Sequence, residues 1–429
     1  MDNMSNNTSA GAADNTSDDS TSPAPGSRER VNFIWYLCGV GSWFSMFGMQ
    51  VVLFPWLVLI ALQESAARAG TAQMALLLPG LLFILLGGAV ADRKDRRAIT
   101  RLCHLLGGIP ALLLAAAVML DLLSFPLMLA YGFAVGTAQA FLFPARDGML
   151  PYIARGNIQR AVTSATMVQF AVQLGGFALA GMAASIGAAP LLVVQALLLW
   201  FGALAFHRLD LSHLPAPVRS GPAPRNLAMI ADTALIVWRH RTLRDVIILI
   251  GGMGFFLMGV IFVGVPLVIR DIYGGDSGDL ALINMFNMGG MSLTAFVLLR
   301  KGGVARQGRA ITCALGIGGL MLAAIGLGLP YPAPLLLMAG WGICGSITMS
   351  MGRTIVQEAS PEAHRSRAMA FYMLGFMGTA PFGSFMIGQL AEYIGPLHAI
   401  AFSALGMTVI ALWIALRSPI WRLEGSGNS

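Results

Sequence analysis

The chain has very few charged residues for its length. Of its 429 residues, only 11% are Asp, Glu, Lys or Arg, whereas 56% are hydrophobic and the mean hydropathy is +0.73. A soluble domain carries about 25% charged residues, so the composition excludes an ordinary soluble protein. A polytopic membrane protein is the class that fits, and the length leaves room for about twelve spans of ~20 residues.

Cysteine and the usual catalytic motifs are also scarce. The four cysteines fall inside apolar runs without metal-ligand spacing, so we expect small core residues rather than disulfides or a metal site: Cys38, Cys103, Cys313 and Cys344. The sequence has no G-x-x-x-x-G-K-[ST] loop, zinc spacing or nucleophile elbow, which argues against an enzyme and predicts no cofactor. The net charge of +7 could indicate a nucleic-acid partner, but membrane topology accounts for it, so we expect none.

Apolar runs separated by turn signals predict twelve membrane-spanning helices, an all-α fold. They are residues 33–62, 70–91, 98–120, 125–144, 161–187, 189–207, 243–269, 280–299, 309–329, 333–351, 368–391 and 397–416. The chain then divides into a disordered cytoplasmic tail at 1–30, a six-helix bundle at 31–207, a cytoplasmic linker at 208–242, a second bundle at 243–417 and a tail at 418–429. Residues 226–238 of the linker are either a short amphipathic helix on the membrane surface or plain linker.

The distribution of Lys and Arg supports this count and sets the orientation. If the loop at residues 92–97 faces the cytoplasm, the outer loops contain only Arg68 and Arg270, and the other basic residues fall on the cytoplasmic side or its boundary. Both termini are then cytoplasmic. We expect a multi-pass protein of a bacterial inner (plasma) membrane.

The stretch from Gly87 to Thr100 carries six charges in six residues, Asp92 to Arg97, between two apolar runs. Such charges cannot lie in hydrocarbon, so they form a tight loop between spans two and three. The order of residues resembles the cytoplasmic signature of the major facilitator superfamily, G-x-x-x-D-R-x-G-R-[KR], with Gly88, Asp92, Arg93, Arg96 and Arg97 in place. Asp95 stands where that family often has a second glycine.

This resemblance implies two pseudo-symmetric six-helix bundles that bind substrate between them and work by alternating access. It also implies a gate, in which Asp92 meets the N-terminus of span eleven when the cytoplasmic side is closed. Gly88 would allow close approach, and Arg93 and Arg97 would belong to the same gate. The alternative is that these basic residues only fix topology.

An internal repeat supports two duplicated halves. Arg146 and Arg160 in the first half match Arg353 and Arg367 in the second at the same spacing of fourteen residues, and on that register Gly176 and Gly181 match Gly383 and Gly388. We count Arg146, Arg353 and Arg367 among the gating candidates, although they could equally be solvated loop residues. The phrase from Phe143 to Arg146, with Leu150-Pro151, resembles the branch of enterobactin-type siderophore exporters and macrolide efflux proteins.

Polar and aromatic side chains within the spans are candidates for the substrate cavity. They are Trp43, Phe47, Gln50, Gln139, Gln169, Gln173, Asn284, Asn287, Ser346, Thr348 and Tyr372. The alternative for each amide is hydrogen bonding between helices. A cavity with amides, aromatics and little charge suits a bulky, amphiphilic solute.

Acids and bases at mid-depth are scarce, so no proton site is evident from the sequence. Proton coupling is therefore implied only by the family resemblance. We predict a monomeric secondary transporter that uses protons as coupling ion and exports a bulky amphiphilic small molecule, either a siderophore or a drug. An importer or lysolipid flippase of the same fold, or a sensor or scaffold that transports nothing, remains the alternative.

Overall fold

The structure is a computed structural model that describes residues 25–154, 158–210, 235, 237–301, 306–360 and 364–422. Most of the predicted N-terminal tail, residues 211–234 of the predicted linker and residues 423–429 lie outside the described residues.

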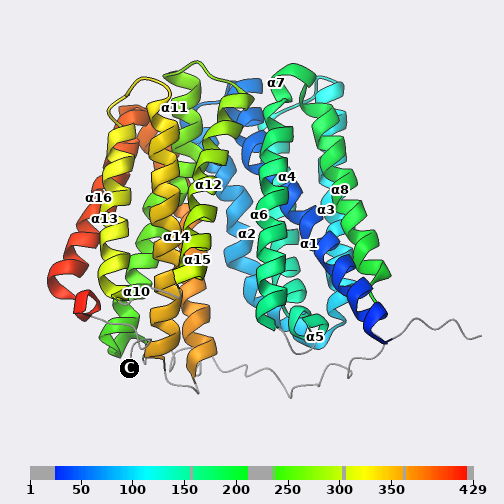
Figure 1. Ribbon diagram of the computed structural model, residues 1–429. Coiled ribbons are helices and arrows are strands. Elements are labelled where there is room, and N and C mark those ends of the chain that lie inside the picture. Colours follow the sequence, from blue (N-terminus) through cyan, green and yellow to red (C-terminus); the bar gives the residue numbers. More distant parts are fainter. Residues whose placement is uncertain are drawn as a thin grey trace, which may run out of the picture.

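All regular elements among the described residues are helical (Figure 1). The first half contains α1 (Pro25–Trp56), the π-helical η1 (Leu57–Ala61), α2 (Ala66–Arg93), α3 (Arg96–Met119), α4 (Phe125–Asp147), α5 (Leu150–Ala154), α6 (Ile158–Gly181), α7 (Ala183–Ile186) and α8 (Ala188–Arg208). The second half contains α10 (Arg241–Gly252), η2 (Met253–Leu257), η3 (Val260–Gly264), α11 (Val265–Asp271), α12 (Ser277–Lys301), α13 (Gln307–Ile325), α14 (Ala333–Ala359), α15 (Arg365–Ile394), α16 (Pro396–Arg417) and η5 (Pro419–Arg422).

Twelve of the described helical segments are long and apolar enough to cross a membrane. Each overlaps one of the twelve predicted spans, so the prediction of an all-α, twelve-span fold is confirmed. Three boundaries differ by more than five residues, and the first of them is the start of α1, at Pro25 instead of residue 33. The fifth span ends at Gly181 and a separate short helix follows, and the tenth continues to Ala359, beyond the predicted end at residue 351. Helix α14 outlasts its apolar run because a helix continues until a cap or breaker ends it.

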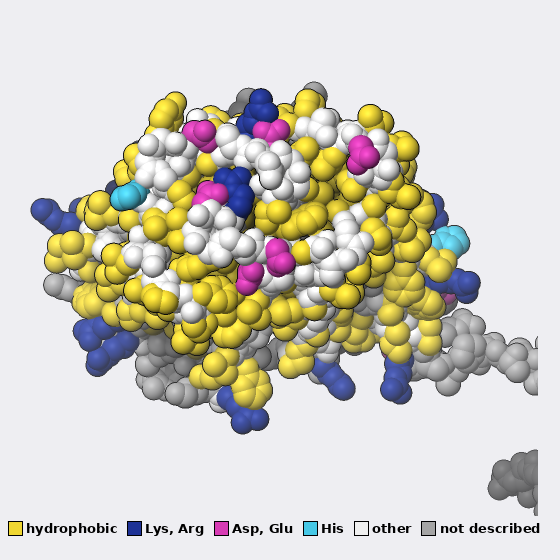
Figure 2. Space-filling view, turned by 90° about the horizontal axis from the view of Figure 1, so that it is seen from above, with side chains coloured by type: hydrophobic (Ala, Val, Ile, Leu, Met, Phe, Trp, Pro, Cys, Tyr) yellow, Lys and Arg dark blue, Asp and Glu magenta, His cyan; other side chains and the backbone are white. Residues whose placement is uncertain are grey.

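Successive spans run in opposite directions, which gives the bundle two distinct ends (Figure 1). We call them the Arg68 end, which holds the first turn of α2 and helix α7 and is uppermost in Figure 1, and the Asp92 end, which holds residues 92–97 and helix α5. Helix α2 runs from the Arg68 end to the Asp92 end, and α15 runs the other way. Figure 2 looks onto the Arg68 end, where acidic and basic side chains gather while hydrophobic side chains cover the flanks.

Helix α3 shows why these helices suit a lipid surrounding. Its exposed stripe consists of leucine and isoleucine, including Leu102, Leu106, Ile109 and Leu113, whereas the buried face holds small residues and His104. An apolar outer stripe facing water would be costly, but hydrocarbon accepts it. Small residues on the inner face let neighbouring helices approach closely.

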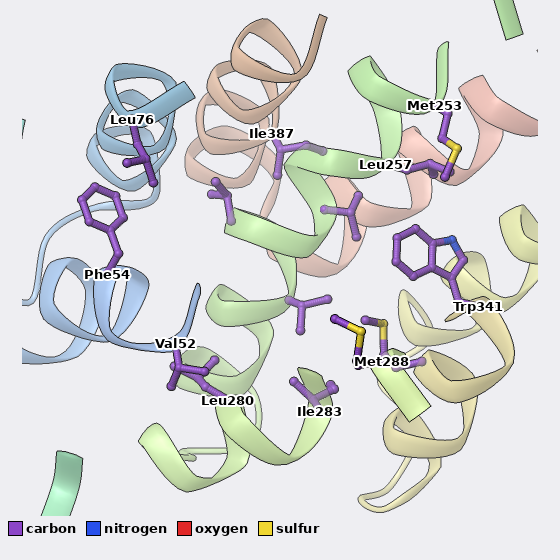
Figure 3. Close-up of a cluster of buried hydrophobic side chains, with 14 of the residues drawn as sticks. Val52, Phe54, Leu76, Met253, Leu257, Leu280, Ile283, Met288, Trp341 and Ile387 are labelled. Atoms are coloured by element: carbon purple, nitrogen blue, oxygen red, sulfur yellow. The ribbon is translucent and has the colours of Figure 1, made fainter. Parts of the chain in front are cut away.

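A continuous apolar core joins the two halves (Figure 3). Leu76 and Phe54 from the first half belong to the same buried cluster as Leu257 and Ile387 from the second. The halves are therefore packed together and not merely tethered.

Matched glycines make matched contacts, so the repeat seen in the sequence is present in the fold. A Cβ atom at Gly176 of α6 would overlap the carbonyl oxygen of Ser45 in α1, and one at Gly383 of α15 would overlap that of Phe255 in η2. Gly181 meets Ala281 of α12, while Gly388 meets Gly70 of α2. The contacts of Gly176 and Gly383 therefore lie within each half, whereas those of Gly181 and Gly388 lie between the halves.

The seventh span is irregular because it is rich in glycine. It changes from α-helix to two π-helical turns, η2 and η3, before α11. Gly254 and Gly259 within this stretch pack so closely that a Cβ would overlap carbonyl oxygens of Phe376 and Gly383 in α15. Such π-turns are frequent at functional sites, and this stretch carries Met258 and Phe262 to the centre of the molecule.

The close packing of α6 on α1 predicts that alanine substitution will have opposite effects on stability at two adjacent glycines. Gly176→Ala should destabilise the protein by about 1–3 kcal/mol, because the new methyl group overlaps the Ser45 carbonyl. Gly175→Ala is the matched control, because a Cβ there meets nothing within 4 Å among the described residues, and alanine favours the helix. Thermal unfolding of the purified variants in detergent measures both, and equal loss in the two would contradict this packing.

Candidate functional site

A cavity of about 190 Å³ lies at mid-depth in the bundle. Three helices of the first half, the irregular seventh span and α15 form its wall. None of the described residues that line it is charged, and three are glutamines. The lining residues are Trp43, Met46, Phe47, Gln50, Val51, Gln73, Leu76, Leu77, Gly80, Ile84, Val135, Gly136, Gln139, Ala140, Phe143, Met258, Phe262, Phe376, Met377 and Ala380.

Four of the eleven sequence candidates line this cavity, namely Trp43, Phe47, Gln50 and Gln139. The described lining does not include Gln169, Gln173, Asn284, Asn287, Ser346, Thr348 or Tyr372. Hydrogen bonds account for four of these seven. Asn287 donates to the Met338 carbonyl and Tyr372 to the Met349 carbonyl, each from one helix to another, whereas Asn284 and Thr348 donate to carbonyls of their own helices.

Two buried residues that the sequence did not single out hold Gln50 in place. The Tyr131 hydroxyl of α4 lies 2.5 Å from Oε1 of Gln50, and Nε2 of Gln195 in α8 donates to the same oxygen at 2.9 Å. All three side chains are buried. The available signal was a polar side chain within an otherwise apolar run, but sequence alone does not show which such residues meet.

His104 is a second residue that the sequence did not single out. It is fully buried in α3, and its Nδ1 lies 2.8 Å from the Thr100 carbonyl, so Nδ1 carries the hydrogen. Its Nε2 has no hydrogen-bond partner among the described residues. The ring lies 5.5 Å from that of Trp43, centroid to centroid, and Trp43 also lines the cavity. The spans therefore contain a buried ionisable side chain, His104, that did not stand out in the sequence.

The two halves are joined by polar contacts at the Arg68 end. The carboxylate of Glu392, at the end of α15, accepts a hydrogen bond of 3.1 Å from the backbone N–H of Ala67 in the first turn of α2. The Arg270 guanidinium donates to the carbonyls of Leu59 and Glu64 at 3.2 and 2.8 Å. A carboxylate at a helix N-terminus is stabilised by the exposed N–H groups and the helix dipole.

A second cross-half contact at this end joins α12 to α6 and α7. The Ser277 hydroxyl donates to the Gly181 carbonyl and accepts from the Ala184 N–H, both at 2.9 Å. The Arg68 end is therefore closed by contacts on two sides of the bundle.

The charged loop at the Asp92 end makes local contacts instead. Asp92 pairs with Arg96 at 3.2 Å, and its side chain is 67% exposed. Arg96 also donates to the Gly148 carbonyl at 2.7 Å, and Arg97 donates to the carbonyls of Phe206 and His207. These arginines cap the C-terminal ends of α4 and α8, so they bind the spans of the first half together.

Two glycine-related details of this loop differ from the family pattern. Asp95, which replaces a glycine, caps α3 by accepting a hydrogen bond of 2.9 Å from the Arg97 N–H. Gly88 faces open space among the described residues, and its neighbour Gly87 makes the close helix contact, against Ala140 of α4. Arg93 lies exposed in the last turn of α2.

The described side chains of the other arginine candidates, Arg146 and Arg353, belong to different halves of the chain. Arg146 is buried, pairs with Asp147 at 2.7 Å, and stacks on Phe44 and Phe143. Arg353 is exposed on α14, and the side chain of Arg367 lies outside the described residues. No group of three or more His, Cys, Asp or Glu residues in the described part of the chain could hold a metal ion.

Twelve spans around a central uncharged cavity define a membrane transporter for small molecules, and comparison with known proteins identifies the family. Residues 36–377 match the model of the Major Facilitator Superfamily, so the chain belongs to that family. It is 28% identical to the multidrug efflux pump Tap of Mycolicibacterium fortuitum over 86% of this chain and 90% of Tap. Identity to Tap of Mycobacterium bovis is 24%, over 87% of this chain and 90% of that protein.

Solved structures of transporters share the fold. The nucleoside transporter NupG matches with a TM-score of 0.70 at 16% identity, over 90% of this chain and 97% of NupG. The inward-open xylose transporter XylE of E. coli matches with a TM-score of 0.68 at 13% identity, over 93% of this chain and 98% of XylE. At these identities the likeness concerns the fold alone.

The Glu392 contact predicts a shift in the opening of the Arg68 end. Glu392→Gln removes the charge held at the N-terminus of α2, worth about 0.3–1 kcal/mol, so the open population should rise about two- to fivefold. Spin labels at the exposed positions Leu120 and Leu327 would report a larger fraction of long distances.

Glu64→Gln is the matched control for that measurement. The Glu64 carboxylate lies at the same end but pairs within its own half, with Arg68, so its loss should leave the distances unchanged. Identical distance distributions for wild type and Glu392→Gln would show that this contact does not hold the halves.

Proposed function

We propose that the protein exports a bulky amphiphilic small molecule, a drug-like compound or a siderophore, across a bacterial plasma membrane by proton-coupled alternating access. The observation that carries this proposal is the uncharged, aromatic and amide-lined cavity in a chain whose relatives include multidrug efflux pumps. An apolar solute with a few polar groups can enter such a cavity without leaving a charge unpaired. An importer or a lysolipid flippase of the same fold is the alternative, and the transport assay below distinguishes it from an exporter.

The cycle that we propose exchanges contacts between the two ends. The Lys and Arg distribution favours a cytoplasmic Asp92 end, so a structure closed at the Arg68 end is inward-facing. Helices α2 and α15 are antiparallel, and the end of α15 lies at the start of α2. Glu392 is seated at the start of α2 here, and Asp92 would take the equivalent place at the start of α15 when the cytoplasmic side closes.

His104 is our candidate for the proton site. It is a buried ionisable side chain with an unpartnered Nε2, and Trp43 contacts both its ring and the cavity. The Ser42 hydroxyl, the Phe206 ring and the Gly39 backbone lie beside it, and the positive charge of Arg146 repels a proton there. Binding a proton at Nε2 would place a charge behind one wall of the cavity, which links protonation to substrate release.

Solute accumulation in cells that lack their own efflux pumps tests the proposed function. Cells carrying the wild-type chain should accumulate less of at least one compound in a panel of siderophores and amphiphilic drugs, and a protonophore should abolish the difference. Asp92→Asn should restore accumulation because the gate contact is lost, while Lys94→Gln, which removes a neighbouring exposed charge, should not. Unchanged accumulation of every compound would contradict export.

A separate prediction concerns His104. His104→Gln cannot take up a proton, so export by this variant should no longer respond to external pH, whereas export by the wild-type chain should, while the variant still folds. His398→Gln is the matched control, since His398 makes the same bond from Nδ1 to the carbonyl four residues earlier, at 2.9 Å, but is exposed. Wild-type pH dependence in His104→Gln would place the proton site elsewhere.

A further inference from the structure

The amide of Gln50 is fixed in one orientation by a chain of buried hydrogen bonds. Nε2 of Gln195 lies 3.4 Å from the Met46 carbonyl, which can only accept, so this position belongs to the donor atom of Gln195. The same Nε2 donates to Gln50 at 2.9 Å, so the atom that faces it must be Oε1 of Gln50. A flipped Gln50 amide would bring two N–H donors together.

The Tyr131 hydroxyl reinforces this orientation. It lies 2.5 Å from Oε1 of Gln50 and 3.3 Å from Oε1 of Gln195. The oxygen of Gln50 is therefore fully used by the protein. The remaining polar atom, Nε2 of Gln50, is buried and has no hydrogen-bond partner among the described residues.

This unpartnered donor belongs to a residue that lines the cavity. Gln50 is only 4% exposed and stands in the cavity wall. A buried N–H without a partner is costly, and such groups are normally satisfied by protein, water or ligand. Because Tyr131 and Gln195 occupy the amide oxygen, Nε2 is left as the polar atom of Gln50 that a ligand in the cavity could meet.

We infer that Gln50, oriented by Gln195 and Tyr131, is the hydrogen-bond donor that selects substrates bearing an acceptor such as a carbonyl or ether oxygen on an otherwise apolar, uncharged body. This inference rests on the proposed function, since it names the substrate class of the same cavity. It also names Tyr131 and Gln195 as positioning residues, because they hold the donor without lining the cavity.

The chemistry of the wall argues for a neutral acceptor. Of the described lining residues, none is an acid or a base that could neutralise a charged group. A ligand that offers an acceptor satisfies Nε2, whereas a ligand of similar size without one leaves Nε2 unpaired. Discrimination of this kind comes from the unpaired group and not from size.

Equilibrium binding of two neutral fluorescent dyes to the full chain in nanodiscs tests the inference. Nile red carries a carbonyl acceptor, whereas N-phenyl-1-naphthylamine carries an N–H donor and no carbonyl. After subtraction of the signal from empty nanodiscs, Gln50→Met should weaken Nile red binding about three- to tenfold and leave the other dye within about twofold. Tyr131→Phe should weaken Nile red less, because Gln195 still orients the amide.

The control is Gln169→Met, which removes a glutamine outside the described lining of the cavity and should change neither dye. Thermal unfolding of each variant shows whether it folds, and Tyr131→Phe supplies a milder change if Gln50→Met does not. Equal loss for both dyes, unchanged Nile red binding in Gln50→Met, or no Nile red binding to the wild-type chain would overturn the inference. Equilibrium binding needs no proton gradient, so a failure of export in cells would not change the binding result. A failure of the binding prediction would likewise leave the proposed export untouched.

Discussion

The two halves of the molecule pack together at glycines, which have no side chain to hold the helices apart. At the Arg68 end, Gly388 of α15 lies against Gly70 of α2, and a Cβ on Gly388 would come within 2.6 Å of the Gly70 Cα. On the other side of the bundle Gly181 of α6 lies against Ala281 of α12. Gly181 and Gly388 are equivalent positions of the repeat, so both contacts between the halves use the same glycine position. Helix backbones that approach this closely gain dispersion energy in lipid, where no hydrophobic driving force acts between helices.

The position of the cavity follows from that closure. Leu76, Leu77 and Gly80 of α2 line it one to three turns below Gly70, and Phe376, Met377 and Ala380 of α15 line it below Gly388. The same two helices thus form the seal at the Arg68 end and part of the cavity wall. Separating them at Gly70 would expose the cavity to the Arg68 end, so the alternating access that we propose could be carried by one helix pair. Glu392, Arg270 and Ser277 add hydrogen bonds to this closure. These bonds are made at helix ends, whereas the glycines pack along the helix sides.

Sequence predicted the spans and the repeat but only part of the site, for a physical reason. Hydropathy and the placement of Lys and Arg reflect the cost of charge in hydrocarbon, which acts on each span separately, so the twelve spans could be found. Which side of a span faces its neighbours is harder to predict, since lipid and helix interior are both apolar. That is why Gln50 and Asn287 appeared equivalent, although one lines the cavity and the other bonds the Met338 carbonyl. His104, Tyr131 and Gln195 were missed because their importance depends on partners far away in the chain.

The central claim is that the contacts at the Arg68 end must separate during transport. A disulfide between Gly181→Cys and Ala281→Cys tests it most directly, in a chain whose four native cysteines are replaced. The Ala281 Cβ lies 2.8 Å from the position of a Cβ on Gly181, within about 1 Å of the Cβ separation in a disulfide. Our account predicts that the oxidised protein transports nothing and that reduction restores transport. Equal transport by the oxidised and reduced protein would contradict it.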